Sequence, residues 1–145
     1  MDQRDQPPAM VLRIFPDYAD TVIWNDFGPV PYEDINLSAQ LQHELEAWER
    51  FYYEKATPYF EWAVASDRER FTEDGRRLTE SIAKEVGSEF EFELRLSDRG
   101  PKNMVRSDSA PTNPEAARAF HELVREKREW EDRMGRIEQE TKAGH

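Results

Sequence analysis

Residues 37–56, LSAQLQHELEAWERFYYEKA, contain the pattern around which the rest of the chain is organised. Apolar residues recur there at the periodicity of one face of an α-helix. They are Leu37, Leu41, Leu45, Trp48 and Tyr52. Ser38 is placed to cap this helix, because a serine oxygen accepts a hydrogen bond from a backbone amide of the first turn. The helix should end near Thr57-Pro58, since the residue before a proline disfavours helical geometry.

Two segments on either side of this helix have the composition of strands. Residues 10–15, MVLRIF, are apolar on both faces apart from Arg13, which is typical of a strand in the middle of a small sheet. Residues 21–24 follow as a second strand that would form a hairpin with the first. Residues 88–96 alternate strictly between apolar and charged side chains, so one face of this strand is buried and the other is in water. We expect residues 88–96 to pair with residues 10–15 in an antiparallel sheet.

A second long helix fits residues 67–86, just before the last of these strands. Its apolar stripe consists of Phe71, Gly75, Leu78, Ile82 and Val86. Gly75 would allow a close approach to the first helix, and Gly87 stands where a left-handed C-cap is expected. Pro58 can start a further short helical turn that would place Trp62 beside the first helix. The sequence therefore predicts an α+β fold, with a small antiparallel sheet packed on a helical hairpin.

The C-terminal part predicts one more long helix. Asn113 and Pro114 have the residue types of an N-cap and a first helical position. Apolar residues then alternate by four and three, with one polar break at Lys127, which is a heptad pattern. After Ala116 they are Phe120, Leu123, Trp130, Met134 and Ile137. This seam either docks on the chain's own domain or pairs with another chain in a homodimer. The predicted organisation is a flexible leader (1–9), an α+β domain (10–97), a linker (98–113) and a C-terminal helix (114–141).

Charge is distributed unevenly along the 145 residues. The formal net charge is −11, and counting side chains gives −12 for residues 1–98 and +1 for residues 99–145. Such a field repels nucleic acid and anionic membranes and attracts basic proteins, although it also serves solubility alone. The chain has no cysteine and no stretch resembling a signal peptide or a membrane span, so we expect a cytoplasmic protein.

The segment 17–34 combines carboxylates with aromatic side chains. Gly28, Pro29 and Pro31 indicate an ordered loop without regular structure. Aromatic residues supply buried area at an interface, and acids steer and pair with basic groups, so this loop is a candidate surface for a basic protein partner. The alternative is that the rings plug the open end of the sheet while the acids are solvated. The candidate residues are Asp17, Tyr18, Asp20, Trp24, Asp26, Phe27, Tyr32, Glu33 and Asp34.

Three glutamates form a second candidate surface on the strand at 88–96. Glu89, Glu91 and Glu93 point to one face of that strand. Like charges in a row are unfavourable unless cations meet them. Those cations belong either to this chain, for example Arg13, or to a basic partner.

Enzymatic motifs are lacking. His43-Glu44 and His121-Glu122 are not followed by the second histidine of a zinc helix, and no glycine-rich phosphate loop, GxSxG elbow or EF-hand loop occurs. Basic residues near the C-terminus are interleaved with acids, which is typical of a solvated helix face. We therefore expect no catalytic residues, no metal, no cofactor and no direct contact with nucleic acid.

Three stretches together carry a family resemblance. In order they are LSAQLQHELEAWERFY (37–52), FTEDGRRLTESIAKEVG (71–87) and FEFEL (90–94). This order resembles a type of small acidic protein common among actinobacteria, and the resemblance covers about residues 10–96. Some small acidic proteins of this style look like immunity partners of polymorphic toxins. The resemblance implies a fold but transfers no site.

These observations favour a non-enzymatic protein-binding module, either an immunity or an inhibitor protein against a basic partner. In this hypothesis the carboxylates pair with the partner's cations while Trp24, Phe27 and Tyr32 fill its cleft. The alternative is a structural subunit that self-associates through the C-terminal helix.

Overall fold

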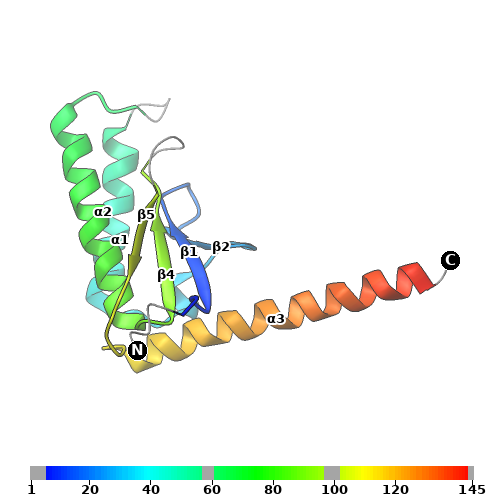
Figure 1. Ribbon diagram of the computed structural model, residues 1–145. Coiled ribbons are helices and arrows are strands. Elements are labelled where there is room, and N and C mark those ends of the chain that lie inside the picture. Colours follow the sequence, from blue (N-terminus) through cyan, green and yellow to red (C-terminus); the bar gives the residue numbers. More distant parts are fainter. Residues whose placement is uncertain (1–5, 57–60, 97–101, 144–145) are drawn as a thin grey trace.

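The structure is a computed structural model that describes residues 6–56, 61–96 and 102–143 (Figure 1). It has a five-stranded mixed sheet and three helices, so the predicted α+β fold is confirmed. The elements in chain order are β1 (Met10–Ile14), β2 (Ile23–Asn25), β3 (Gly28–Pro29), the short 3-10 helix η2 (Tyr32–Asp34), α1 (Ala39–Lys55), α2 (Ala65–Val86), β4 (Phe90–Leu94), β5 (Asn103–Arg106) and α3 (Pro114–Ala143).

The sheet has the strand order β3-β2-β1-β4-β5. The predicted hairpin of β1 with β2 and the predicted pairing of β1 with β4 are both present. The orientation of the second pair corrects the prediction, because β1 and β4 are parallel, with Met10 opposite Phe90 and Ile14 opposite Leu94. The physical reason is the helical pair α1–α2, which returns the chain to the end of the sheet where β1 begins.

Two short strands lie where the sequence predicted none. Residues 98–113 were predicted to be a linker, but β5 pairs antiparallel with β4 there. Gly28 and Pro29 were predicted to lie in an irregular loop, but they form β3 against Trp24 and Asn25. Both are short edge strands without a strict apolar alternation, so their pairing depends on the neighbouring strand more than on their own composition.

The two helices of the hairpin follow the predicted pattern. The Ser38 hydroxyl accepts a hydrogen bond from the Leu41 amide at 3.3 Å, and α1 ends at Lys55. A Cβ atom on Gly75 would lie 2.8 Å from Cζ2 of Trp48, so α1 and α2 approach closely at this glycine. Gly87 ends α2 with φ +90°, a left-handed conformation that disfavours other residues. The helical turn predicted from Pro58 falls partly on residues 57–60, outside the described residues, while Trp62 packs against Tyr52.

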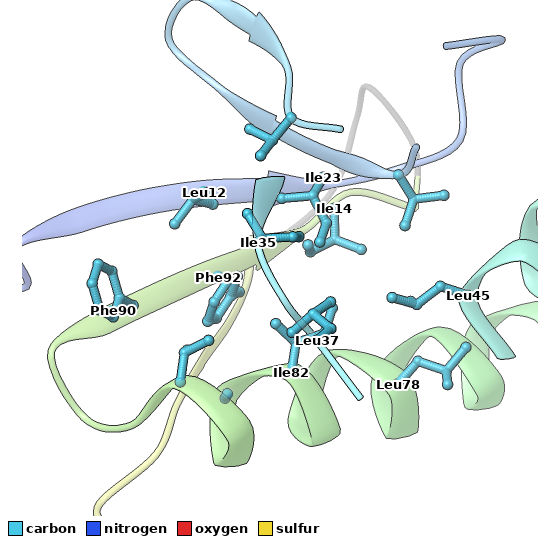
Figure 2. Close-up of a cluster of buried hydrophobic side chains, with 14 of the residues drawn as sticks. Leu12, Ile14, Ile23, Ile35, Leu37, Leu45, Leu78, Ile82, Phe90 and Phe92 are labelled. Carbon is cyan, nitrogen blue, oxygen red and sulfur yellow. The ribbon is translucent and has the colours of Figure 1, made fainter. Parts of the chain in front are cut away.

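The core lies between the sheet and the two helices. Alternate residues of β1 and β4 point from one sheet face toward α1 and α2, as Figure 2 shows. Leu12, Ile14, Phe90 and Phe92 meet α2 residues such as Ile82, and all five side chains are fully buried. The strict alternation in β4 thus places one row of residues in the core and leaves the glutamates on the opposite face.

Helix α3 crosses the end of the sheet at which β1 and β4 begin. Asn113 caps it by accepting a hydrogen bond from the Ala116 amide at 3.2 Å. Phe120 is fully buried, with ring centroids 5.5 Å from Phe90 and 6.0 Å from Phe92. Beyond this contact the helix runs out from the rest of the protein, and its C-terminal end lies far from the sheet (Figure 1). The seam therefore docks on the chain's own domain only over its first half.

Candidate protein-binding site

The most exposed aromatic side chain of the candidate loop is Tyr18, which lies between β1 and β2 and is 69% exposed. Its ring stacks on that of Tyr53 from α1, with centroids 4.2 Å apart and an interplanar angle of 12°. Asp17 and Asp20 are both exposed on either side of it. We call Asp17, Tyr18 and Asp20 the Tyr18 patch. An aromatic ring beside two carboxylates is suited to hold a lysine or arginine side chain.

A hydrogen-bonded chain supports the Tyr18 patch from below. The Tyr18 amide donates to the Tyr53 hydroxyl at 2.5 Å, and that hydroxyl donates to Oε2 of Glu49 at 2.6 Å. Glu49 is only 7% exposed. Burial, together with the hydrogen bond to Glu49, raises the pKa of Tyr53 above its usual value. The hydroxyl therefore stays protonated and keeps donating to Glu49 over the physiological pH range.

The backbone of the patch is held in an uncommon conformation. Tyr18 has φ +55° and Asp20 has φ +60°, both in the left-handed region. A residue other than glycine in this region costs on the order of 1–3 kcal/mol, which the surrounding contacts must offset. Here the Tyr53 stacking and hydrogen bond supply such contacts. The patch is consequently preorganised, which lowers the entropy cost of binding.

Replacing Tyr53 by phenylalanine tests this support. The variant Tyr53→Phe keeps the stacked ring but removes the hydroxyl, so the buried Glu49 side chain and the Tyr18 amide lose their shared partner. We expect the free energy of unfolding to fall by about 1–2 kcal/mol and the Tyr18 loop to exchange its amide hydrogens faster. Urea unfolding and hydrogen exchange measure these quantities. Unchanged unfolding and unchanged exchange in Tyr53→Phe would contradict the role of the Tyr53 hydroxyl.

Tyr32 was predicted to face a partner, and the structure corrects this. It is 7% exposed, and its hydroxyl accepts a hydrogen bond from the Val22 amide at 3.1 Å. Tyr32 therefore belongs to the core, which agrees with the alternative that the aromatic rings of this loop are buried against the sheet. Its neighbours Glu33 and Asp34 are exposed on η2.

Trp24 also makes its main contacts within the chain. Its ring stacks on Phe15, with centroids 4.8 Å apart, and its indole N–H donates to the Phe15 carbonyl at 3.0 Å. One side of the ring is thus covered and its only donor is used. Trp24 can contribute an edge to an interface, but it cannot swing out to fill a cleft without losing these contacts.

Asp26 and Phe27 form the turn between β2 and β3, which lies against α3. Nζ of Lys127 donates a hydrogen bond to the Asp26 carboxylate at 2.7 Å. The Phe27 ring packs edge-on against the Trp130 ring, with centroids 5.1 Å apart. The hydrogen bond from Lys127 lowers the pKa of Asp26, so this carboxylate is charged at neutral pH. The polar break in the predicted heptad, Lys127, therefore has a partner in this turn.

Two of the three strand glutamates, Glu89 and Glu93, contact a side chain of this chain. Glu93 pairs with Arg95 at 3.3 Å, and Glu91 lies opposite Arg106 in the register of β4 with β5. Glu89 lies just before β4, where Nε2 of His121 approaches its carboxylate to 2.5 Å. Arg13, considered from the sequence as a neutralising cation, lies opposite Glu93 in the register of β1 with β4, and its guanidinium is 4.0 Å from Asp26. The predicted site residues therefore fall into separate groups, and among their aromatic side chains that of Tyr18 is the most exposed.

The candidate residues of α3 also divide into two groups. Phe120 is buried and Leu123 is partly buried against the core, so these two serve docking within the chain. Trp130, Met134 and Ile137 are exposed. The single seam seen in the sequence thus has two different environments.

Tyr53 and Glu49 were not identified from the sequence. Both lie on α1 beside the apolar stripe rather than in it, and no motif links them to the loop before the helix. The signal in the sequence was the additional tyrosine next to Tyr52, which a purely amphipathic helix does not require. Within the described ranges no three His, Asp or Glu side chains are arranged to hold a metal ion, and no helix combines the length and apolarity of a membrane span.

Comparison with known proteins identifies the family of this chain. No curated protein matches the chain. A family model described as Serratia CdiI immunity protein-like matches residues 10–95, from the first residue of β1 to just beyond β4. The match covers more than half of the chain and leaves β5 and α3 outside. The chain belongs to the Serratia CdiI immunity protein-like family.

Proposed function

We propose that this chain is a cytoplasmic immunity protein that binds a toxin with a basic surface and occludes it, without catalysing a reaction. Membership of an immunity protein-like family supports the class of function. The observation that carries the proposed site is the preorganised Tyr18 patch, in which an exposed ring stands between two exposed carboxylates. The alternative is a subunit that self-associates through α3. It uses a different surface and is compatible with binding through the Tyr18 patch.

The charge of the chain supports a basic partner. Residues 1–98 carry a net charge of −12, and this part includes the whole matched region. A field of this sign accelerates the approach of a positive surface and repels anionic competitors. The field acts at a distance, while the Tyr18 patch provides the contact.

The contact chemistry follows from the groups in the patch. A lysine or arginine of the partner would lie over the Tyr18 ring, and its charge would pair with Asp17 or Asp20. Cation–π contacts contribute roughly 0.5–2 kcal/mol, with the higher value when water is excluded. Tyr18 would then be the aromatic anchor in place of Tyr32, which is buried.

Neutralising the two aspartates tests the proposed site. The partner is first captured from the native host at low ionic strength with the full chain as bait, and its association is then followed by stopped flow. In Asp17→Asn/Asp20→Asn we expect the association rate to fall several-fold and its salt dependence to weaken, because two steering charges are lost. Asparagine also tolerates the left-handed conformation of position 20.

Glu80→Gln/Glu73→Gln on α2 is the matched control, since it removes the same charge from exposed helix positions. Equal losses in the two double variants would show that only net charge matters and would overturn the proposed site. An association rate of the unaltered protein that does not change between low and high salt would overturn the basic partner.

A further inference from the structure

The C-terminal half of α3 carries an exposed apolar stripe. Trp130 is 43% exposed, Met134 36% and Ile137 51%. They continue, at spacings of four and three, the same seam whose earlier members Phe120 and Leu123 pack against the core. We call residues 128–142 the α3 extension. The first half of the seam is covered by the domain, whereas in the second half Trp130 contacts Phe27 and all three apolar side chains are exposed.

Few contacts hold the α3 extension against the rest of the protein. Trp130 touches Phe27 of the β2–β3 turn, and residues 131–142 are all exposed. A helical segment of about four turns without tertiary packing is marginal in water. Covering the stripe would therefore stabilise the segment as well as remove apolar surface from water.

The charge of the α3 extension indicates what covers it. Its residues 128–142 include four basic and five acidic side chains, a net charge of −1 that is close to neutral, whereas residues 1–98 have a net charge of −12. A basic partner is attracted to the domain and gains little from a neutral helix. A helix of alternating charge with one apolar stripe is complementary to another of the same kind, as in coiled coils.

We propose that the α3 extension pairs antiparallel with the α3 extension of a second copy of this chain. In the heptad register, Met134 packs against Ile137 of the second copy and Trp130 against Thr141 of the second copy. Arg133 then flanks Glu140 of the second copy, and this pair occurs twice. Antiparallel pairing places the two acidic domains at opposite ends of the dimer, whereas parallel pairing would bring them together.

One type of like-charged pair disfavours the antiparallel arrangement. Glu131 lies beside Glu138 of the second copy, so two like-charged pairs accompany the two favourable ones. The parallel arrangement instead pairs Arg133 with Glu138 of the second copy. The two arrangements therefore differ in the residue that Arg133 meets, and charge reversal can distinguish them.

The first test is the mass of the full chain in solution across a dilution series, by sedimentation velocity. We expect the mass to rise toward twice that of one chain with concentration. Ile137→Glu should weaken the association at least about tenfold, because it places a charge in the apolar stripe. Gln139→Glu adds the same charge on the opposite face of the helix and should change it little. A protein that remains monomeric throughout, or equal effects of the two variants, would overturn the proposal.

The second test concerns orientation. Arg133→Glu should weaken the association, and Arg133→Glu/Glu140→Arg should restore it. Restoration by Arg133→Glu/Glu138→Arg, with none by the first pair, would overturn the antiparallel arrangement. None of these positions contacts the Tyr18 patch, so capture of the partner protein is expected to be unchanged in all of them.

Discussion

Phe120→Ala is expected to lower the free energy of unfolding by about 3–5 kcal/mol, the range for truncating a large, fully buried aromatic side chain. Phe120 is 0% exposed and touches both Phe90 and Phe92, so its removal leaves a cavity between α3 and β4. Because it is the main apolar contact between the first half of α3 and the sheet, the docking of the whole helix should weaken. Urea unfolding followed by circular dichroism measures the change.

Phe27→Ala provides the comparison for this prediction. Phe27 is 50% exposed and has Trp130 as its aromatic neighbour, so its truncation should cost less than about 1 kcal/mol. If both phenylalanines had the same small effect, α3 would not depend on its contact with the sheet for its position. The position of the α3 extension relative to the sheet would then not be explained by the Phe120 contact.

Gly75→Ala is expected to destabilise the protein by about 3 kcal/mol, although alanine is the better helix former. The added Cβ would lie 2.8 Å from Cζ2 of Trp48 and 3.4 Å from Leu94, so Trp48 must move. That movement disturbs the stacking of Trp48 on Phe71 and the hydrogen bond from its indole N–H to the Phe71 carbonyl, 3.0 Å long. The expected loss of stability combines the strain of overpacking with the weakening of this hydrogen bond.

Gly135→Ala is the matched control, because it makes the same substitution in a helix where nothing lies within 4 Å of the new atom. There the helix propensity acts alone, and we expect a gain of up to about 1 kcal/mol in the stability of the helix. The two substitutions should thus have opposite signs in thermal unfolding and helicity. A stabilising effect of Gly75→Ala would show that α1 and α2 do not approach as closely as the structure has them.

Local patterns predicted the three long helices and the strands β1, β2 and β4, but not β3 or β5. The amphipathic periodicity of α1 and α2, the Ser38 and Asn113 caps, the Gly87 terminus and the alternation in β4 are all properties of neighbouring residues, and each is present. The direction of β4 relative to β1 was not predictable in this way, because alternation indicates which face of a strand is buried and not which way it runs.

The candidate site shows the same limit. The sequence pointed to Asp17, Tyr18 and Asp20 among many residues, but it ranked the buried Tyr32 equally with them. Aromatic residues in a loop have no periodicity from which burial can be read. The support from Tyr53 and Glu49 depends on the packing of α1 against a loop, and Tyr53 follows Tyr18 by 35 residues, so only the three-dimensional structure specifies this contact.

The parallel pairing of β1 with β4 has a consequence for how the chain folds. These two central strands lie at opposite ends of the matched region, with the whole of α1 and α2 between them. Contacts between residues so far apart in sequence require a large loop to close, which slows folding relative to a chain of local contacts. During synthesis the β1–β2 hairpin can form early, but one edge of β1 has no partner until β4 has left the ribosome. The core is therefore completed only when nearly the entire family domain has been made, and no surface that depends on this core is in place earlier.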